Sequence, residues 1–143
     1  MAKFTNVKCS EEALVGGALE ARGAAKLRGG LIESIEAVDL DAQDGSLLAA
    51  TINKGLLVYT STTGGGTLTL DTAANIISTC GLEKDNDTIK CYVVNDGNQT
   101  VTVAVATGTT IADTGQTIGN NEAAIILFRR TASDAVVAYI IGA

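Results

Sequence analysis

Acidic residues gather between positions 39 and 45 in an arrangement that invites comparison with a calcium loop. Asp39, Asp41 and Asp44 precede Gly45. An EF-hand loop needs ligands at positions 1, 3 and 5, Gly at position 6 and Glu at position 12. Counted from Asp39, the third acid stands at position 6, Gly at position 7 and Ala50 at position 12. The pattern fails, so we expect an acidic turn in solvent rather than a weak cation site.

The same three aspartates, together with Asp87, are the candidate catalytic groups of the chain. The sequence contains no His, which removes the commonest general base and the commonest zinc ligand. Gly64-Gly65-Gly66 lacks the G-x-x-x-x-G-K-[ST] pattern and a following Lys that would bind a nucleotide phosphate. We therefore expect no enzyme activity and no cofactor.

Cysteine is the remaining reactive residue type. Cys9, Cys80 and Cys91 cannot all pair within one chain, and none belongs to a C-x-x-C motif. We expect Cys91 to be a small buried thiol and Cys80 to lie at the end of an element, before Gly81. Neither position indicates a redox or metal site.

Composition excludes several classes of partner. The 143 residues carry a net charge of −6, and no basic cluster is present for a nucleic acid or an anionic membrane. Aromatic residues make up only 3%, too few for a platform that stacks sugars or bases. The longest apolar runs fall far short of the roughly 20 residues of a membrane span. No apolar segment of a secretion signal follows the N-terminus, so we expect synthesis in a host cytoplasm.

The elements that would carry any site are mostly strands. The clearest is a β-hairpin predicted over residues 87–106, with Asn95-Asp96-Gly97 as a three-residue loop that places Gly97 at positive φ. This register puts apolar residues on one face and polar ones on the other. The apolar face comprises Ile89, Cys91, Val93, Val101, Val103 and Val105. The second face comprises Thr88, Lys90, Tyr92, Thr100, Thr102 and Ala104.

Residues 1–54 lack the continuous strand pattern of the rest of the chain, and we predict that they form an N-terminal arm or docking segment. Ser10 to Leu14 resembles a helix start, but paired glycines soon interrupt the pattern. A short supported helix and an extended arm remain alternatives there. Residues 31–40 fit both helical and strand spacing, and we favour a strand or arm.

Residues 55–143 are predicted to form a β-sandwich domain. Strands are expected at residues 55–62 and 67–70, followed by a short helix over residues 73–77 that Asp71 can cap and that ends near Cys80. The last two strands, residues 122–129 and 135–141, are expected to pair as a hairpin. They are apolar on both faces, which is typical of strands covered on both sides.

A second copy of the chain is the expected cover for the exposed side of this last hairpin. The predicted interface residues are Ile125, Ile126, Leu127, Phe128, Val136, Val137, Tyr139 and Ile141.

From residue 55 onward the pattern resembles the small β-sandwich proteins that decorate or cement the capsids of tailed phages and aquatic viruses. The resemblance covers Asp87-Thr88, Val93-Val94-Asn95, Thr107-Gly108-Thr109, Ala123 to Arg130 and Val136 to Ile141. It implies an all-β, antiparallel, jelly-roll-like sandwich. It also implies a homotrimer on the outer capsid surface of the virion that stabilises contacts between major capsid subunits. The alternatives are another structural assembly, such as a fibre tip, a tail part or a self-polymerising filament, and a module that binds glycans or a receptor.

Overall fold

The computed structural model describes residues 35–60, 63–112 and 116–142. Contacts divide the chain into residues 1–33 and a compact unit of residues 34–143. The helix start predicted at Ser10, and Cys9, lie outside the described residues. The compact unit starts well before the domain boundary predicted after residue 54, so two strands and a helix on the N-terminal side of that boundary belong to it.

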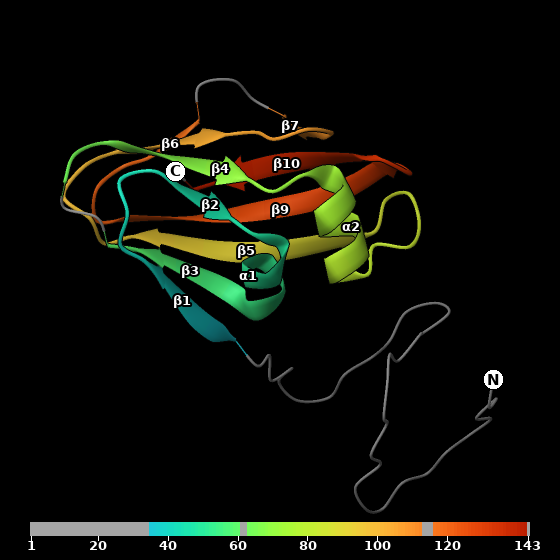
Figure 1. Ribbon diagram of the computed structural model, residues 1–143, viewed down its shortest axis with the longest axis horizontal. Helices are drawn as coiled ribbons and strands as arrows, with labels where there is room; N and C mark the ends of the chain where they lie inside the picture. Colours follow the sequence, from blue (N-terminus) through green and yellow to red (C-terminus); the bar gives the residue numbers. More distant parts are fainter. Residues whose placement is uncertain (1–34, 61–62, 113–115, 143) are drawn as a thin grey trace, which may run out of the picture. The chain divides into compact units, whose positions relative to one another are not determined.

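Two β-sheets form the unit (Figure 1). The large sheet has six strands in the order β1-β3-β5-β9-β10-β7. Their bounds are β1 Glu36–Leu40, β3 Gly55–Tyr59, β5 Thr88–Asn95, β9 Glu122–Ala132, β10 Ala135–Ile141 and β7 Thr109–Ile111. The small sheet has four strands in the order β2-β4-β6-β8. Their bounds are β2 Gly45–Leu47, β4 Gly66–Leu70, β6 Val101–Ala104 and β8 Thr117–Ile118.

Successive strands alternate between the two sheets from β1 to β9, and among the described strands only β9 and β10 follow one another within a sheet. Helices α1 (Ala49–Lys54) and α2 (Ala73–Cys80) lie on two of the return paths to the large sheet. Because each return brings the chain back in the same direction, β1, β3 and β5 pair in parallel, as do β2, β4 and β6. The prediction of a mostly-β sandwich is confirmed, but the sheets are mixed rather than antiparallel.

The hairpin predicted over residues 87–106 is wrong. β5 pairs with β3 and β9 in the large sheet, whereas β6 pairs with β4 and β8 in the small one. Gly97 is not among the described glycines with positive φ. The predicted inward face is nevertheless largely correct, because both strands present alternate residues to the same core from opposite sides. Cys91, Val93, Val101 and Val103 are buried, while Val105 is exposed.

The last hairpin and the second helix are confirmed. β9 and β10 pair in antiparallel fashion, with a register shift at Ala135. α2 ends at Cys80 with Gly81 in the left-handed conformation. Its N-cap is Thr72, whose Oγ1 accepts a hydrogen bond from the backbone N–H of Asn75 at 3.3 Å, rather than the predicted Asp71.

The core lies between the sheets and is closed at one end by both helices. The large sheet contributes Leu57, Tyr59, Cys91, Val93, Ala124, Ile126, Phe128, Val136 and Ala138. The small sheet contributes Leu47, Leu68, Leu70, Val101, Val103 and Ile118, and the helices add Ala49, Ile52, Ala73 and Ile76. Within the described part of the chain, no helix is long and apolar enough to cross a bilayer.

Candidate functional site

The candidate site is the face of the large sheet that points away from the core, which we call the outer face. Side chains of a strand point alternately to the two sides of a sheet, so residues between the buried ones lie on this face. The outer face comprises Leu56 and Val58 of β3, Lys90, Tyr92 and Val94 of β5, Ala123, Ile125, Leu127 and Arg129 of β9, and Val137, Tyr139 and Ile141 of β10.

Strand register aligns these side chains in rows across the sheet. Leu56, Tyr92, Ile125 and Ile141 occupy one row over four neighbouring strands. The next row holds Lys90, Leu127 and Tyr139. Opposed side chains in such rows pack against one another, so the outer face is a continuous apolar surface. Its members are half-buried, apart from Ala123, Lys90 and Ile141, which are exposed.

The predicted interface residues divide between two environments. Ile126, Phe128 and Val136 are completely buried in the core of a single chain. They follow the inward parity of β9 and β10, so they cannot touch a partner, and the predicted set is corrected by removing them. Ile125, Leu127, Val137 and Tyr139 are half-buried on the outer face, and Ile141 keeps 53% of its surface exposed.

Sequence reasoning missed the contribution of β3 and β5 to this surface. Leu56 and Val58 belong to a run that is apolar at both parities, which is the same signal that singled out residues 125–128. Tyr92 and Lys90 were placed correctly on the side of β5 opposite the core. Their neighbours on that side could not be named without the pairing of β5 with β3 and β9.

Two cations of the outer face lie over aromatic rings. The Nζ of Lys90 is 5.4 Å from the ring centre of Tyr92, and the Cζ of Arg129 is 5.6 Å from that of Tyr139. Both separations are within the range of cation–π attraction. The Nε of Arg129 is buried and has no hydrogen-bond acceptor among the described residues.

Two of the four candidate aspartates accept hydrogen bonds from the backbone. Asp44 accepts a hydrogen bond from the backbone N–H of Thr67 at 2.8 Å, and Asp87 accepts one from Lys84 at 2.8 Å. In residues 35–60, 63–112 and 116–142, no group of three or more His, Cys, Asp or Glu side chains could hold a metal ion. A Cβ at Gly66 would collide with the carbonyl of Gln43, so this glycine serves a close backbone approach.

Burial makes the two described cysteines poor nucleophiles. It raises the pKa of the Cys80 thiol to about 11, and the nearby Asp71 carboxylate adds to this effect. Burial likewise raises the pKa of the Cys91 thiol to about 12, against the opposing effect of a backbone hydrogen bond. Cys91 is in the core, as predicted. Neither thiol is a thiolate near neutral pH.

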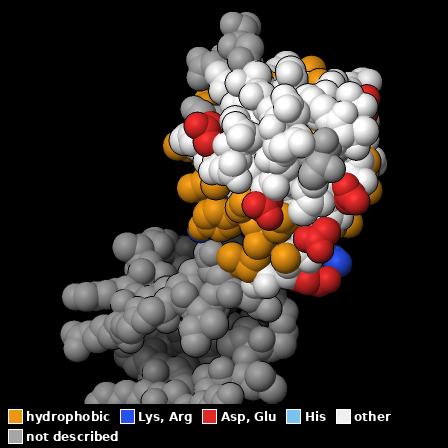
Figure 2. Space-filling model, turned by 90° about the vertical axis from the view of Figure 1, so that its left-hand side faces the viewer, with side chains coloured by type: hydrophobic (Ala, Val, Ile, Leu, Met, Phe, Trp, Pro, Cys, Tyr) orange, Lys and Arg blue, Asp and Glu red, His pale blue; other side chains and the backbone are white. Residues whose placement is uncertain are grey.

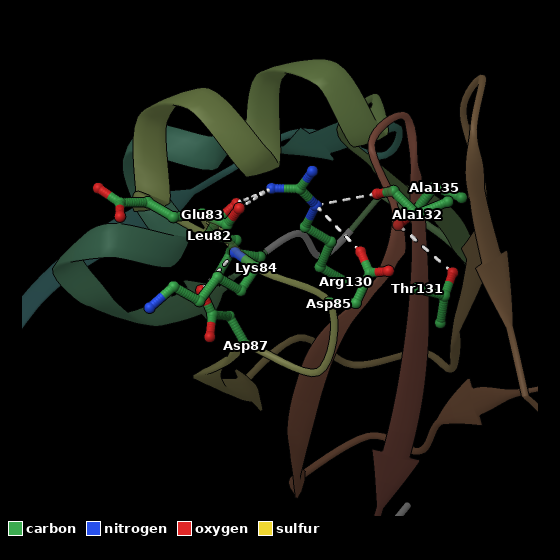
Figure 3. Close-up of polar contacts among 9 residues, drawn as sticks. All are labelled: Leu82, Glu83, Lys84, Asp85, Asp87, Arg130, Thr131, Ala132 and Ala135. Carbon is green, nitrogen blue, oxygen red and sulfur yellow. Dashed lines mark hydrogen bonds and ion pairs between the residues drawn. The ribbon is translucent and has the colours of Figure 1, made fainter. Parts of the chain in front are cut away.

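Arg130, next to the outer-face Arg129, points to the opposite side of β9 and contacts the loop between α2 and β5 (Figure 3). Its Nη1 donates to the carbonyl oxygens of Leu82 and Glu83 at 2.7 and 2.6 Å, and its Nε donates to that of Ala132 at 3.0 Å. The Nε also lies 3.7 Å from a carboxylate oxygen of Asp85. Arg130 therefore fixes the loop between α2 and β5 to the end of β9.

Comparisons with protein-family models, curated proteins and solved structures found no match. The properties of the site are therefore inferred from its own residues and geometry. Hydrophobic side chains gather on one side of the described unit, with acidic side chains beside them (Figure 2). Such a surface can bind a complementary apolar surface of another macromolecule.

Proposed function

We propose that the protein is a viral structural protein: a capsid decoration or cement protein. In this proposal it trimerises on the outer surface of the capsid and stabilises contacts between major capsid subunits. The role is structural rather than catalytic. The proposal is supported by one observation above the others, the continuous apolar outer face of the large sheet.

An apolar sheet face favours association because the removal of apolar surface from water lowers the free energy. Full burial of a Leu, Ile or Val side chain contributes about 1.5–3 kcal/mol. Leu56, Ile125, Leu127, Val137 and Ile141 would each gain part of this amount when covered. A structural protein that occurs in many copies on a regular lattice needs such a surface.

The jelly-roll-like fold implied by the resemblance belongs to the same proposal. Passage of successive strands between two sheets is compatible with it. The parallel pairs β1–β3, β3–β5, β2–β4 and β4–β6 depart from a purely antiparallel arrangement.

The first test is the absolute mass of the purified protein by light scattering over a dilution series. We expect a trimer that persists at micromolar concentration. Leu127→Asp should shift the mass towards the monomer because it places a charge in the centre of the outer face. Ser133→Asp, in the exposed turn between β9 and β10, is the matched control and should stay trimeric. A wild-type protein that is monomeric throughout would contradict the proposal.

The second test addresses the capsid. Phage heads from which the native decoration protein has been removed are mixed with the trimer and sedimented. Co-sedimentation that saturates at a fixed ratio to the major capsid protein is expected. Long regular polymers of the protein alone under negative stain, without binding to heads, would instead favour the self-polymerising filament.

A further inference from the structure

The outer face carries charges of opposite sign at the two ends of its strands. Lys90 and Arg129 lie near the start of β5 and the end of β9. Asp39 lies on the outer side of β1, opposite Val58, towards the other end of the sheet. Continuing the strand register by one residue past Leu40, Tyr59 and Asn95 reaches Asp41, Thr60 and Asp96. The apolar rows stand between a basic end and an acidic end.

The two ends differ in how the charges are presented. At the basic end, both cations are held against the face by the tyrosine rings beneath them. Lys90 is exposed and Arg129 is half-buried, so the charges of both side chains act on an opposing surface. At the acidic end, Asp39, Asp41 and Asp96 are all exposed, so their carboxylates are accessible to a cation from outside the chain.

We infer that the partner of the outer face is a second copy of this chain, oriented so that the acidic end of one copy meets Lys90 and Arg129 of the next. Each copy carries both halves of the contact, and the apolar rows between them are covered at the same time. A partner with a uniform charge of either sign would satisfy one end and repel the other. This inference rests on the proposed self-association and adds its orientation.

The arrangement also accounts for how copies with a net charge of −6 approach one another. Contact between copies without this orientation would bring their acidic ends together. Pairing of the acidic end with the basic end replaces this repulsion by attraction over a short distance, where screening by salt is incomplete.

The test uses charge reversal at both ends of the full-length chain. Lys90→Glu with Arg129→Glu, or Asp39→Lys with Asp41→Lys and Asp96→Lys, should raise the concentration of half-dissociation by roughly tenfold or more. A chain that carries all five reversals should recover most of the wild-type association, because the contact is rebuilt with its signs exchanged. Asp134→Lys, the same change of charge in the β9–β10 turn, is the control and should have no effect.

A salt titration of the wild-type protein provides a readout that needs no variant. Association should weaken as sodium chloride rises from low to physiological concentration. Association that is independent of salt would overturn the inference. So would a chain with all five charge reversals that is folded by circular dichroism but dissociates as readily as the variants reversed at one end. A wild-type monomer would instead remove the proposed function, so the two failures are distinct.

Discussion

Asn95 is a completely buried amide that directs the chain from one sheet to the other. Its Nδ2 donates to the carbonyl oxygens of Gln99, Ile118 and Gly119 at 2.8, 3.0 and 2.9 Å. Its Oδ1 accepts from the backbone N–H of Gly97 at 3.1 Å. The bonds to Ile118 and Gly119, which are distant in the sequence, explain why Asn95-Asp96-Gly97, whose composition favours a hairpin loop, forms a crossover. Local turn propensity is weaker than a fully satisfied buried network.

Asn95→Asp should lower the free energy of unfolding by about 3 kcal/mol at neutral pH, because a carboxylate would face three carbonyl oxygens without a hydrogen to donate. The pKa of the new carboxyl would be raised in the folded state. The deficit should therefore shrink as the pH falls towards the pKa of the unfolded chain and grow as it rises. Urea denaturation at several pH values measures this. Gln99→Glu, exposed in the same loop, is the control, and an equal loss in both variants would contradict the assignment.

The raised pKa values of Cys80 and Cys91 give a second prediction at the residue scale. In the folded protein at pH 8, iodoacetamide should modify Cys91 very slowly and Cys80 slowly, because little thiolate is present. Both should react readily after unfolding in urea. Peptide mass spectrometry follows each cysteine separately and so distinguishes them from Cys9. Rapid modification of Cys91 under native conditions would show that the thiol is accessible and ionised.

At the scale of elements, Asp71 couples the two helices. Its Oδ2 accepts from the backbone N–H of Ala49 at the start of α1, which has no side-chain cap of its own. Its Oδ1 accepts from the backbone N–H of Thr72 and from the Nδ2 of Asn75 at the start of α2. Burial acts to raise the pKa of Asp71, but these hydrogen bonds outweigh burial and lower it below 3.8.

Because the folded pKa of Asp71 is depressed, its contribution to stability is present above the unfolded pKa and is lost as the pH falls through the folded value. Asp71→Asn should cost about 1 kcal/mol at neutral pH, as the loss of a helix cap does. The difference from the wild type should narrow below about pH 4. Thermal melts of both proteins from pH 3 to 7 test this, and a difference that does not change with pH would contradict it.

The loop between α2 and β5 depends on Arg130. Arg130→Ala should lower the free energy of unfolding by about 2–3 kcal/mol, because it removes charge-assisted hydrogen bonds to Leu82, Glu83 and Ala132. Hydrogen exchange should increase in residues 82–87. Asp85→Asn, whose carboxylate is 63% exposed, should change stability by about 0.5 kcal/mol or less. If the two variants were equally destabilised, the ion pair rather than the carbonyl contacts would hold the loop.

For the whole molecule, sequence reasoning predicted the periodicities but not the connections. Period-two patterns located the inward faces of β5 and β6. In β9 both faces are apolar, so the inward residues Ile126 and Phe128 were predicted at an interface instead. The helix α2 was predicted near its observed position, although its N-cap is Thr72 rather than Asp71. The sheet to which each strand belongs depends on partners that are distant in the sequence, such as those of Asn95. The predicted interface was limited to β9 and β10, because Leu56, Tyr92 and the two charged ends become neighbours of these strands through register alone.

The alternation of strands between the sheets also determines how the chain must fold. Only β9 and β10 are strand partners joined by a short turn; the other pairings in the described residues join segments separated by intervening elements. Such a topology has high contact order, and entropy must be lost in closing long loops before most of the sheet energy is recovered. We expect refolding on the millisecond-to-second scale, with the β9–β10 hairpin as the natural nucleus. Until β5 and β3 pair with that nucleus, its apolar strands can associate with another chain. The yield of folded protein should therefore fall as the protein concentration rises.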